Sequence, residues 1–314
     1  MVEKVIIIGS GPAGLSAALY AGRDGFSPLV ISGYAKGGQL ELTTTVENFP
    51  GFPEGVQGPE LMDLMRRQAE KFGARFIDKD ATAVDLKSTP FKVVVENDVY
   101  EADSVIVATG ANARWLGIES EKKFIGRGVS NCATCDAAFF KGKNVIVVGG
   151  GDTAMEDSLY LTNFAASVTI VHRRDAFRAS KIMQERVMSN PKIKVIWNSV
   201  VQEVKGDVKV RSVVIKNTVT GEIVEMPIDG IFVAIGYEPN TKLFKDQLQI
   251  DELGYIVTHD EVKTDIPGVF VAGDVADRFY KQAAVAAGSG VKCALQVRAY
   301  LSELYYNRSK QQVQ

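Results

Sequence analysis

No apolar stretch in the 314-residue sequence approaches the roughly 20 residues that a transmembrane helix needs. The first apolar run, residues 5–8, is too short for the core of a signal peptide and leads directly into a glycine-rich turn. Lys and Arg number 36 against 38 Asp and Glu, so charge gives no support for nucleic acid or an anionic membrane as partner. These absences predict a cytoplasmic, globular protein that is long enough for two domains.

Cysteine is scarce as well, with three residues in the whole chain. Three are too few for a disulfide framework, and a reducing compartment disfavours a persistent structural bridge. Two of them lie in the segment Cys132-Ala133-Thr134-Cys135-Asp136, whose spacing is typical of a redox-active pair, a metal site or a coincidence. Zinc needs about four ligands, and the remaining candidates, Cys293, His172 and His259, are scattered along the chain. We therefore expect no metal, favour a redox pair, and expect Cys293 to be a buried small hydrophobe.

What the sequence does contain is a glycine-rich turn near its start, Gly9-Ser10-Gly11-Pro12-Ala13-Gly14. The segment Lys4 to Ile8, which is apolar from Val5 onward, predicts a buried strand before it, with a helix over about 13–23 and a second strand over 29–31. In such a turn Gly9 allows the tight bend, Gly11 lets a pyrophosphate reach the backbone, and Gly14 permits close helix–sheet packing. The acidic residue that usually ends the second strand is missing, and Ser32 stands in its place, which predicts a weaker contact to a ribose.

A second turn of the same kind, Gly149-Gly150-Gly151-Asp152-Thr153-Ala154, follows an expected strand at residues 144–148. The helix after it should end near residue 164, and the next strand should cover 168–171. Instead of an acidic residue, His172-Arg173-Arg174 ends that strand, with Arg178 four positions further on. Guanidinium groups suit a 2′-phosphate, so this site should prefer NADPH to NADH, although a solvated basic surface is the alternative reading.

The segments outside these two turns predict a long loop, an internal repeat, a domain crossing and a last helix. Residues 34–58 form a long loop, read either as a functional loop with Gln39 and Asn48 as hydrogen-bonding groups or as an ordinary surface loop. The buried strand and glycine at 104–110 recur at 230–236, which indicates an internal repeat. Loosely patterned, glycine-bearing residues 111–130 suggest a domain crossing, and a last helix should run from about Gln282 to Leu301.

The Cys132–Asp136 segment has chemistry of its own. If a short helix begins after Cys132, the helix dipole lowers the pKa of that thiol and makes it the better attacking thiolate. Cys135 lies one turn further on, close enough to form a disulfide with it. Asp136 could move a proton to or from a departing thiol, for which burial should raise its pKa.

Taken together, these motifs resemble the low-molecular-weight thioredoxin reductases of the pyridine nucleotide-disulfide oxidoreductase family. The match runs nearly end to end, and the Cys-Ala-Thr-Cys-Asp piece between the two turns is its most specific part. The segments that carry it are Gly9 to Gly14, Gly37-Gly38-Gln39-Leu40, Cys132 to Asp136, Gly149-Gly150-Gly151, His172 to Asp175 with Arg178, Gly273-Asp274-Val275 and Gln282-Ala283. The larger reductases carry an added dimerisation domain, which this length excludes.

The resemblance implies an α/β fold of two Rossmann-like domains, with an NADPH domain inserted into a split FAD domain. The FAD domain would comprise residues 1–114 and 244–314, and the NADPH domain residues 115–243. The activity implied is that of a thioredoxin-disulfide reductase, in which reducing equivalents pass from NADPH through FAD and the cysteine pair to oxidised thioredoxin. Rotation of one domain against the other would present the pair to flavin and to thioredoxin in turn, and the enzyme would be a homodimer.

Site residues are implied one by one on matching positions. In the family the first cysteine attacks thioredoxin and the second faces the flavin, which makes Cys132 the interchange thiol, Cys135 the flavin-proximal thiol and Asp136 the acid–base group. Residues implied for FAD are Gly9, Ser10, Gly11, Pro12, Ala13, Gly14, Gly38, Gln39, Leu40, Asn48, Val84, Ala108, Thr109, Gly110, Gly273, Asp274, Lys281, Gln282 and Ala283. Residues implied for NADPH are Gly149, Gly151, Asp152, Thr153, Ala154, His172, Arg173, Arg174, Arg178, Ile235 and Gly236.

Two positions depart from the family pattern. Ala137 replaces the usual glycine after the motif aspartate, and Lys281 replaces the usual arginine before Gln282, which keeps the charge but loses the fork. Two rival functions also stay open on the sequence: a flavoprotein that reduces oxygen or small dithiol substrates, and a redox-switched sensor that binds NADPH and flavin. Turnover of oxidised thioredoxin with NADPH separates the three.

Overall fold

The computed structural model describes residues 2–43 and 45–312, and the chain divides into two compact units. Unit 1 comprises Met1–Asn112 and Glu238–Gln314, and unit 2 comprises Ala113–Tyr237. The two connecting segments, β11 (Ala111–Ala113) and β20 (Tyr237–Pro239), pair with each other as strands. The unit boundaries thus fall a little before the ends of the domains expected from the sequence, after residues 114 and 243.

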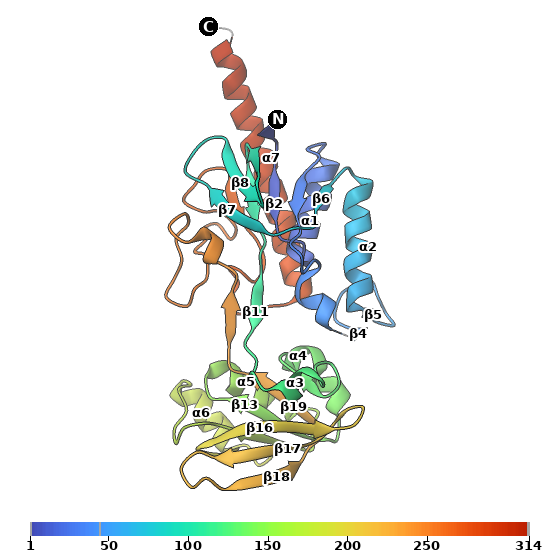
Figure 1. Cartoon of the computed structure of the whole chain (residues 1–314), viewed down its shortest axis with the longest axis vertical. Helices are drawn as coiled ribbons and strands as arrows, with labels where there is room; N and C mark the ends of the chain where they lie inside the picture. Colours follow the sequence, from blue (N-terminus) through green and yellow to red (C-terminus); the bar gives the residue numbers. More distant parts are fainter. Residues whose placement is uncertain (1, 44, 313–314) are drawn as a thin grey trace. The chain divides into compact units, whose positions relative to one another are not determined.

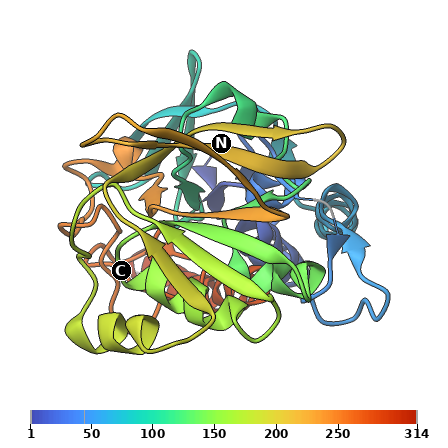
Figure 2. The ribbon, with the colours of Figure 1, turned by 90° about the horizontal axis from the view of Figure 1, so that it is seen from below.

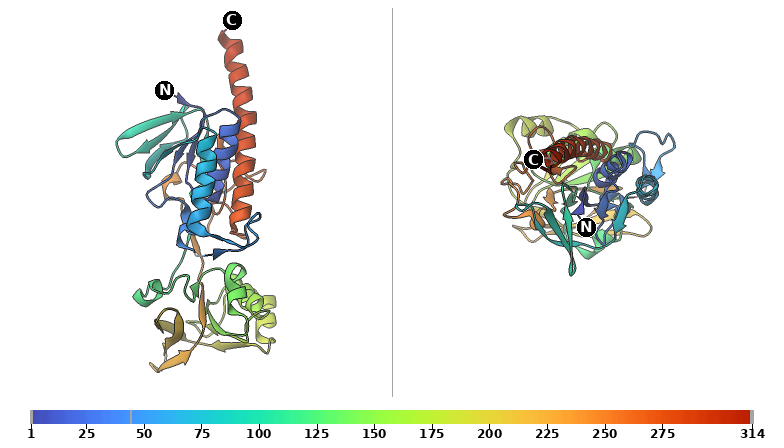
Figure 3. Two further views of the ribbon diagram at one scale, coloured as in Figure 1. Left: turned by 90° about the vertical axis from the view of Figure 1, so that its right-hand side faces the viewer. Right: turned by 90° about the horizontal axis from the view of Figure 1, so that it is seen from above.

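Unit 1 is built on a five-stranded parallel sheet in the order β21-β10-β2-β3-β6. Its central strands are short, apolar and fully buried, because both faces of the sheet are covered. Helices α1 and α7 cover one face, with α2 packed on α1, and a four-stranded sheet in the order β1-β9-β8-β7 covers the other (Figures 1 and 3). The bounds are β1 Val2–Glu3, β2 Ile6–Ile8, α1 Pro12–Arg23, β3 Leu29–Ile31, α2 Gly58–Lys71, β6 Arg75–Ile77, β7 Ala81–Asp85, β8 Phe91–Val95, β9 Asp98–Ala102, β10 Val105–Val107, η3 Lys242–Phe244, β21 Val269–Val271 and α7 Ala283–Gln312.

Helices α1 and α7 approach each other closely because glycine stands at the point of contact. A Cβ atom on Gly290 of α7 would lie 2.0 Å from the carbonyl oxygen of Ala13, in the first turn of α1. Around Gly288, two residues earlier in the same helix, no atom of the described residues outside the backbone of α7 itself lies within 4 Å of the corresponding Cβ position. The two glycines therefore differ in their packing, although both lie inside one helix.

Gly290→Ala is expected to destabilise the protein by about 1–3 kcal/mol, because the added methyl group forces α7 away from the backbone of α1. Gly288→Ala is the matched control and should be neutral or stabilising by up to about 1 kcal/mol, since alanine is the better helix former and has room there. Urea unfolding of the two variants measures the difference. Equal unfolding free energies would contradict the close approach of the two backbones.

Unit 2 repeats this architecture with a parallel sheet of five strands in the order β12-β19-β13-β14-β15. Helices α4, α5 and α6 lie on one face, and the antiparallel strands β16, β17 and β18 cover the other, as Figure 2 shows from below. The bounds are α3 Glu119–Lys122, β12 Val129–Ser130, α4 Ala133–Asp136, η2 Ala137–Phe140, β13 Asn144–Gly149, α5 Asp152–Leu161, β14 Ser167–Val171, α6 Lys181–Met188, β15 Ile193–Ile196, β16 Ser199–Gly206, β17 Val210–Asn217, β18 Ile223–Pro227 and β19 Gly230–Ala234.

The internal repeat expected from the sequence is present in the sheet order. In unit 1 the strand before the glycine turn, β2, lies between β10 and β3. In unit 2 the corresponding strand, β13, lies between β19 and β14. Both units are therefore Rossmann-like, and the fold class expected from the sequence is confirmed.

Two local expectations were wrong, and one helix was not expected. Residues 34–58 are not structureless, because they contain η1 (Gly38–Leu42) and the paired strands β4 (Thr45–Val46) and β5 (Val56–Gln57). Helix α6 was not predicted at all. The last helix does not end near Leu301 but continues to Gln312, and the carboxylate of Asp103 holds the extension by accepting hydrogen bonds from Tyr305 Oη at 2.9 Å and Arg308 Nη2 at 2.8 Å. None of the helices in the described part of the chain is long and apolar enough to cross a membrane.

Candidate functional site

In the glycine turn of unit 1, the first and last glycines are tightly packed, whereas the backbone between them has space beside it. A Cβ atom on Gly9 (φ +113°) would lie 2.1 Å from the carbonyl oxygen of Ala108, and one on Gly14 would lie 2.0 Å from that of Gly9. No atom of the described residues lies within 4 Å of the Cβ position of Gly11, the residue that caps α1. Gly9 and Gly14 thus pack turn, helix and sheet together, and the open backbone at Gly11 leads into the N-terminus of α1, where an anionic phosphate is favoured.

Serines fix the edge of this turn. Ser10 Oγ donates to the carbonyl oxygen of Ser32 at 3.0 Å and accepts from the backbone N–H of Gly37 at 3.1 Å. Ser32, at the end of β3, is 5% exposed, and its Oγ forms no hydrogen bond of normal geometry among the described residues, although it lies close enough to Asp78 to help lower the pKa of that carboxyl. A buried hydroxyl without a partner is costly, so this group is suited to a ligand hydroxyl such as that of a ribose.

Polar side chains from distant parts of unit 1 meet beyond the turn. Gln39 Nε2, in η1, donates to Asn112 Oδ1 at 3.0 Å, and Asn48 Nδ2 donates to Gln282 Oε1 at 3.2 Å. Asn112 Nδ2 in turn donates to Asn240 Oδ1 at 3.0 Å. The structure therefore brings Gln39, Asn48 and Gln282 into pairs, and adds Asn112 and Asn240, which were not among the predicted site residues.

Residues that follow β10 and β21 complete the open edge of the sheet in unit 1. Ala108, Thr109 and Gly110 come directly after β10, and Thr109 Oγ1 donates to the carbonyl oxygen of Asn240 at 2.8 Å. After β21, Gly273 (φ +77°) is tightly packed, since its Cβ would lie 2.9 Å from that of Ala13. Next to it, burial, reinforced by the nearby Asp277 carboxylate, raises the pKa of Asp274 to about 6.

Val84 and Lys281 differ from the other residues predicted for FAD. Val84 lies in β7 of the antiparallel sheet, where its partly buried side chain packs on an apolar cluster. Lys281 has a positive φ of +47°, and its Nζ donates to the carbonyl oxygen of Arg278. Burial lowers the pKa of Lys281, against the opposing effect of the Asp277 and Asp274 carboxylates. The lysine thus points back to its own loop, as expected for a point charge that lacks the fork of arginine.

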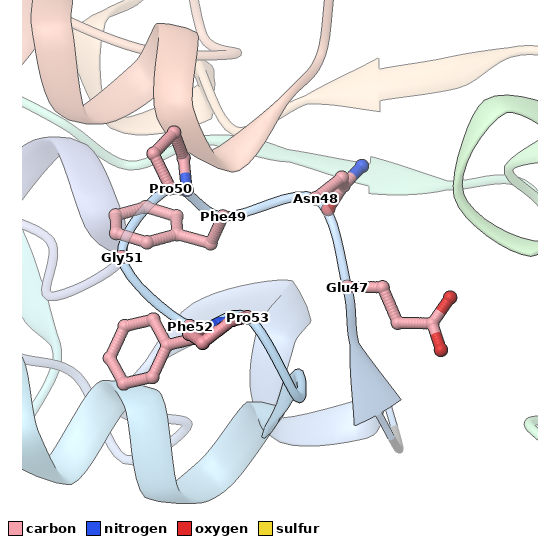
Figure 4. Close-up of a pocket in the computed structure, with 7 residues that line it drawn as sticks. All are labelled: Glu47, Asn48, Phe49, Pro50, Gly51, Phe52 and Pro53. Carbon is pink, nitrogen blue, oxygen red and sulfur yellow. The ribbon is translucent and has the colours of Figure 1, made fainter.

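A surface hollow of about 550 Å³ lies along the loop of residues 47–53 (Figure 4). The rings of Phe49 and Phe52 approach with centroids 6.4 Å apart, and Asn48 directly precedes Phe49 in the same loop. The phenylalanines pack on a small cluster that includes Leu15 and Leu61, so the loop is anchored on α1 and α2. This anchoring fixes the backbone that carries Asn48.

Unit 2 has the same turn with the same division of roles. A Cβ atom on Gly149 would lie 2.3 Å from the carbonyl oxygen of Ala234. At Gly151, the cap of α5, no atom in the described part of the chain lies within 4 Å of the Cβ position. Ala154 takes the place of the last glycine and is fully buried. Gly236 (φ +102°), which follows Ile235 after β19, also has open space at its Cβ position. Residues 151–154 thus form a second cradle for a pyrophosphate.

The three arginines beside this cradle are free to bind an anion. Arg173, Arg174 and Arg178 are all exposed, and none forms an ion pair with a carboxylate among residues 2–43 and 45–312. His172 behaves differently: it is 5% exposed, with Nδ1 2.9 Å from the carbonyl oxygen of Gly149 and Nε2 3.0 Å from that of Ala176. The ring nitrogens of His172 therefore have protein partners, and the exposed cations of this segment are the arginines.

The cysteine pair of unit 2 is a disulfide, with the Cα atoms of Cys132 and Cys135 5.3 Å apart. Cys132 caps α4, which confirms its expected place at the start of a short helix. Its backbone N–H donates to Ser130 Oγ at 3.1 Å, and Thr134 Oγ1 donates to its sulfur at 3.4 Å. Because α4 is a single turn of four residues, its dipole adds only a modest effect on a thiolate.

Exposure differs between the two cysteines. Cys135 is exposed and Cys132 is half-buried, while Asp136, the last residue of α4, is half-buried too.

Ala137, which departs from the family pattern, is 1% exposed and packs in the apolar cluster between the sheet and α5 with φ −56°. An alanine is therefore accommodated there without strain. No cluster of three or more His, Cys, Asp or Glu side chains suited to a metal occurs in the described part of the chain.

Comparison with known proteins agrees with this geometry. Residues 3–290 match the pyridine nucleotide-disulphide oxidoreductase family. The chain is 51% identical to thioredoxin reductase of Rickettsia prowazekii over 308 residues, which cover 96% of this chain and 99% of the relative. It is 52% identical to thioredoxin reductase of Streptomyces coelicolor over 307 residues, 96% of this chain and 95% of the relative. Its structure resembles the crystal structure of thioredoxin reductase from Streptococcus pyogenes MGAS5005, with a TM-score of 0.91 and 43% identity over 95% of this chain and 98% of that one.

Proposed function

The chain belongs to the thioredoxin reductases of the pyridine nucleotide-disulphide oxidoreductase family, and from this membership we propose which of its residues carry each part of the reaction. It is an NADPH-dependent thioredoxin-disulfide reductase with FAD as its bound cofactor. The single observation that carries the assignment of residues is the Cys132–Cys135 disulfide, which shares unit 2 with the arginine-lined glycine turn.

Unit 1 is proposed as the FAD domain. The open backbone at Gly11 and the N-terminus of α1 would hold the pyrophosphate, and the buried hydroxyl of Ser32 would meet the ribose. Gln39, Asn48 and Asp274 would supply hydrogen-bonding groups to the remainder of the cofactor. When bound, FAD supplies the two-electron transfer between NADPH and the cysteine disulfide.

Unit 2 is proposed as the NADPH domain. The backbone around Gly151 would hold the pyrophosphate, and Arg173, Arg174 and Arg178 would bind the 2′-phosphate. Their exposure and their lack of ion-pair partners among the described residues support this role, because three unpaired cations repel each other until an anion joins them.

The cysteines are proposed to act in sequence. Two electrons and two protons reduce the Cys132–Cys135 disulfide to a dithiol. The Cys132 thiolate then attacks one sulfur of the thioredoxin disulfide, forming a mixed disulfide and releasing the other thioredoxin sulfur as a thiolate. Cys135 attacks the Cys132 sulfur next, which restores the internal disulfide and releases reduced thioredoxin. Asp136, directly after Cys135, would supply the proton that a departing thiolate needs.

Steady-state reduction of oxidised thioredoxin by NADPH, followed at the absorbance of the nicotinamide, tests this assignment. Turnover that requires both the flavin and thioredoxin is the expected result. If the purified yellow protein oxidised NADPH with oxygen or small disulfides and left every protein disulfide intact, the assignment of the cysteines would be wrong.

A homodimer in the cytoplasm is the assembly that we propose from the family. A single chain has a mass of 34.1 kDa. Light scattering that gives the mass of two chains at micromolar concentration would support the dimer, and the mass of one chain would contradict it.

A further inference from the structure

The segment that carries the three arginines, residues 172–180, is fastened to the second glycine turn. Its first attachment is to the backbone: the carbonyl oxygen of Gly150 accepts hydrogen bonds from Arg178 N at 2.8 Å and Ala179 N at 3.2 Å. Residue 150 also has to be glycine, because a Cβ atom there would lie 2.2 Å from Cε1 of His172. The far end of the arginine segment therefore rests on the turn that would hold the pyrophosphate.

The imidazole of His172 makes the second attachment. Its nitrogens lie 2.9 Å from the carbonyl oxygen of Gly149 and 3.0 Å from that of Ala176, so the ring joins the turn to the middle of the segment. Phe177 and Trp197 enclose it, with ring centroids 5.4 and 6.1 Å from that of the imidazole. The buried His172 side chain thus connects the glycine turn to the segment that carries the arginines.

Asp152 makes the third attachment, at the last residue of the segment. Its Oδ1 accepts hydrogen bonds from both the backbone N–H and the Oγ of Ser180, each at 2.8 Å. Both hydrogen bonds hold the pKa of Asp152 below its usual range, and the one from the backbone N–H of Ser180 has the larger effect. The carboxylate is therefore ionised at neutral pH. Ser180 lies two residues after Arg178, and it also caps α6.

A carboxylate at this place works against the binding of a nucleotide. Asp152 is the first residue of α5, directly after the open glycine that would receive a pyrophosphate, and two anions at such a distance repel each other. A negative charge there needs a benefit that outweighs this repulsion. Its two hydrogen bonds to Ser180 supply one, since they are the attachment of the arginine segment closest to α5.

We propose that Asp152 is a positioning residue for cofactor specificity: through Ser180 it holds the segment of Arg173, Arg174 and Arg178 where these side chains reach a 2′-phosphate. The inference rests on the proposed role of the three arginines. Anchoring the segment at both ends before the nucleotide arrives removes the entropy cost of ordering its backbone, so only the arginine side chains are ordered on binding. NADH, which has no 2′-phosphate, gains nothing from this arrangement.

Two substitutions of Asp152 separate the effect of its hydrogen bonds to Ser180 from the effect of its charge. Asp152→Ala removes the acceptor, and we expect it to lower kcat/KM for NADPH and the affinity for adenosine 2′,5′-bisphosphate by about tenfold or more. The value of kcat/KM for NADH should not fall, because removal of the charge also relieves its repulsion of the pyrophosphate. Asp152→Asn keeps an Oδ1 that can accept both hydrogen bonds without the charge, so it should keep the NADPH preference within about threefold of the wild type. Ser180→Ala removes one of the two donors and should fall between them. Asp207→Ala is the matched control, because it removes an exposed carboxylate of unit 2 whose ion-pair partner in the described part of the chain is Arg211, at 3.0 Å.

Steady-state kinetics with both nucleotides, calorimetry with adenosine 2′,5′-bisphosphate and with adenosine 5′-monophosphate, and thermal unfolding of each variant give the result. Unchanged discrimination in a folded Asp152→Ala overturns the inference, and so does an Asp152→Asn variant that loses as much as Asp152→Ala. If Asp152→Ala does not fold, Ser180→Ala takes its place as the test. An unaltered NADPH preference in Ser180→Ala would then overturn the inference. A wild type with no preference for NADPH would instead refute the proposed role of the arginines themselves.

Discussion

Replacing Cys135 by serine is expected to abolish thioredoxin reduction while the protein stays folded and keeps its FAD. The variant cannot form the Cys132–Cys135 disulfide, so the internal redox pair that links flavin to thioredoxin no longer exists. We expect kcat to fall by at least about three orders of magnitude, as when one member of a group of residues acting as a unit is removed. Steady-state turnover with NADPH and thioredoxin measures the loss, and flavin absorbance measures cofactor retention.

Cys293→Ala supplies the control, because this third cysteine lies in α7 with no exposed surface. Burial raises the pKa of the Cys293 thiol, which therefore stays protonated and cannot stand in for either member of the pair. Its replacement by a small apolar side chain should leave turnover within about twofold of the wild type. Unimpaired turnover of Cys135→Ser would rule out transfer through the cysteine pair.

Loss of two arginines is the second change for which we expect a large effect. The double variant Arg173→Ala with Arg178→Ala should lose about 100-fold or more in kcat/KM for NADPH, since each removed guanidinium takes away a charge-assisted contact to the 2′-phosphate. The value for NADH should change by less than about threefold, because its ribose carries a hydroxyl at that position. Kinetics with the two nucleotides at a fixed thioredoxin concentration measure the ratio.

Arg211→Ala is the counterpart for this experiment, since it removes an exposed guanidinium of unit 2 that forms an ion pair with Asp207. Both nucleotides should react with it as with the wild type. A double variant that discriminates between NADPH and NADH as well as the wild type does would mean that residues 173–178 are an ordinary basic surface, the alternative reading that the sequence left open.

Much of the fold could be predicted because its signals are local. Buried parallel strands are short apolar runs, and the glycines at positions 9, 14 and 149 are required by backbone atoms only a few ångströms away. The strand at Leu29–Ile31 was predicted to the residue. The disulfide partners were also predicted correctly, because only three cysteines exist and two are one helical turn apart.

What the sequence did not reveal depends on partners far along the chain. The extension of α7 beyond Leu301 is held by Asp103, about two hundred positions earlier, as the separations of 202 and 205 residues in its two hydrogen bonds show. Asn112 and Asn240 were overlooked for the same reason, since their amides meet across 128 positions. The internal repeat could have pointed to them, because each follows one of the two repeated strand–glycine segments. Helix α6 was missed because its eight residues have only one fully buried side chain, that of Val187.

The pairing of β11 with β20 has a consequence for protein engineering. Unit 2 begins at Ala113 and ends at Tyr237, and Arg114 N donates to the carbonyl oxygen of Gly236 at 2.9 Å, so the two ends of this unit are neighbours. A module whose ends adjoin can be excised from its host or exchanged for a relative without stretching the chain, as tolerated domain insertions show. Residues 113–237 are therefore a natural cassette, and a homologous cassette with a different second glycine turn could transfer its nucleotide preference as one piece.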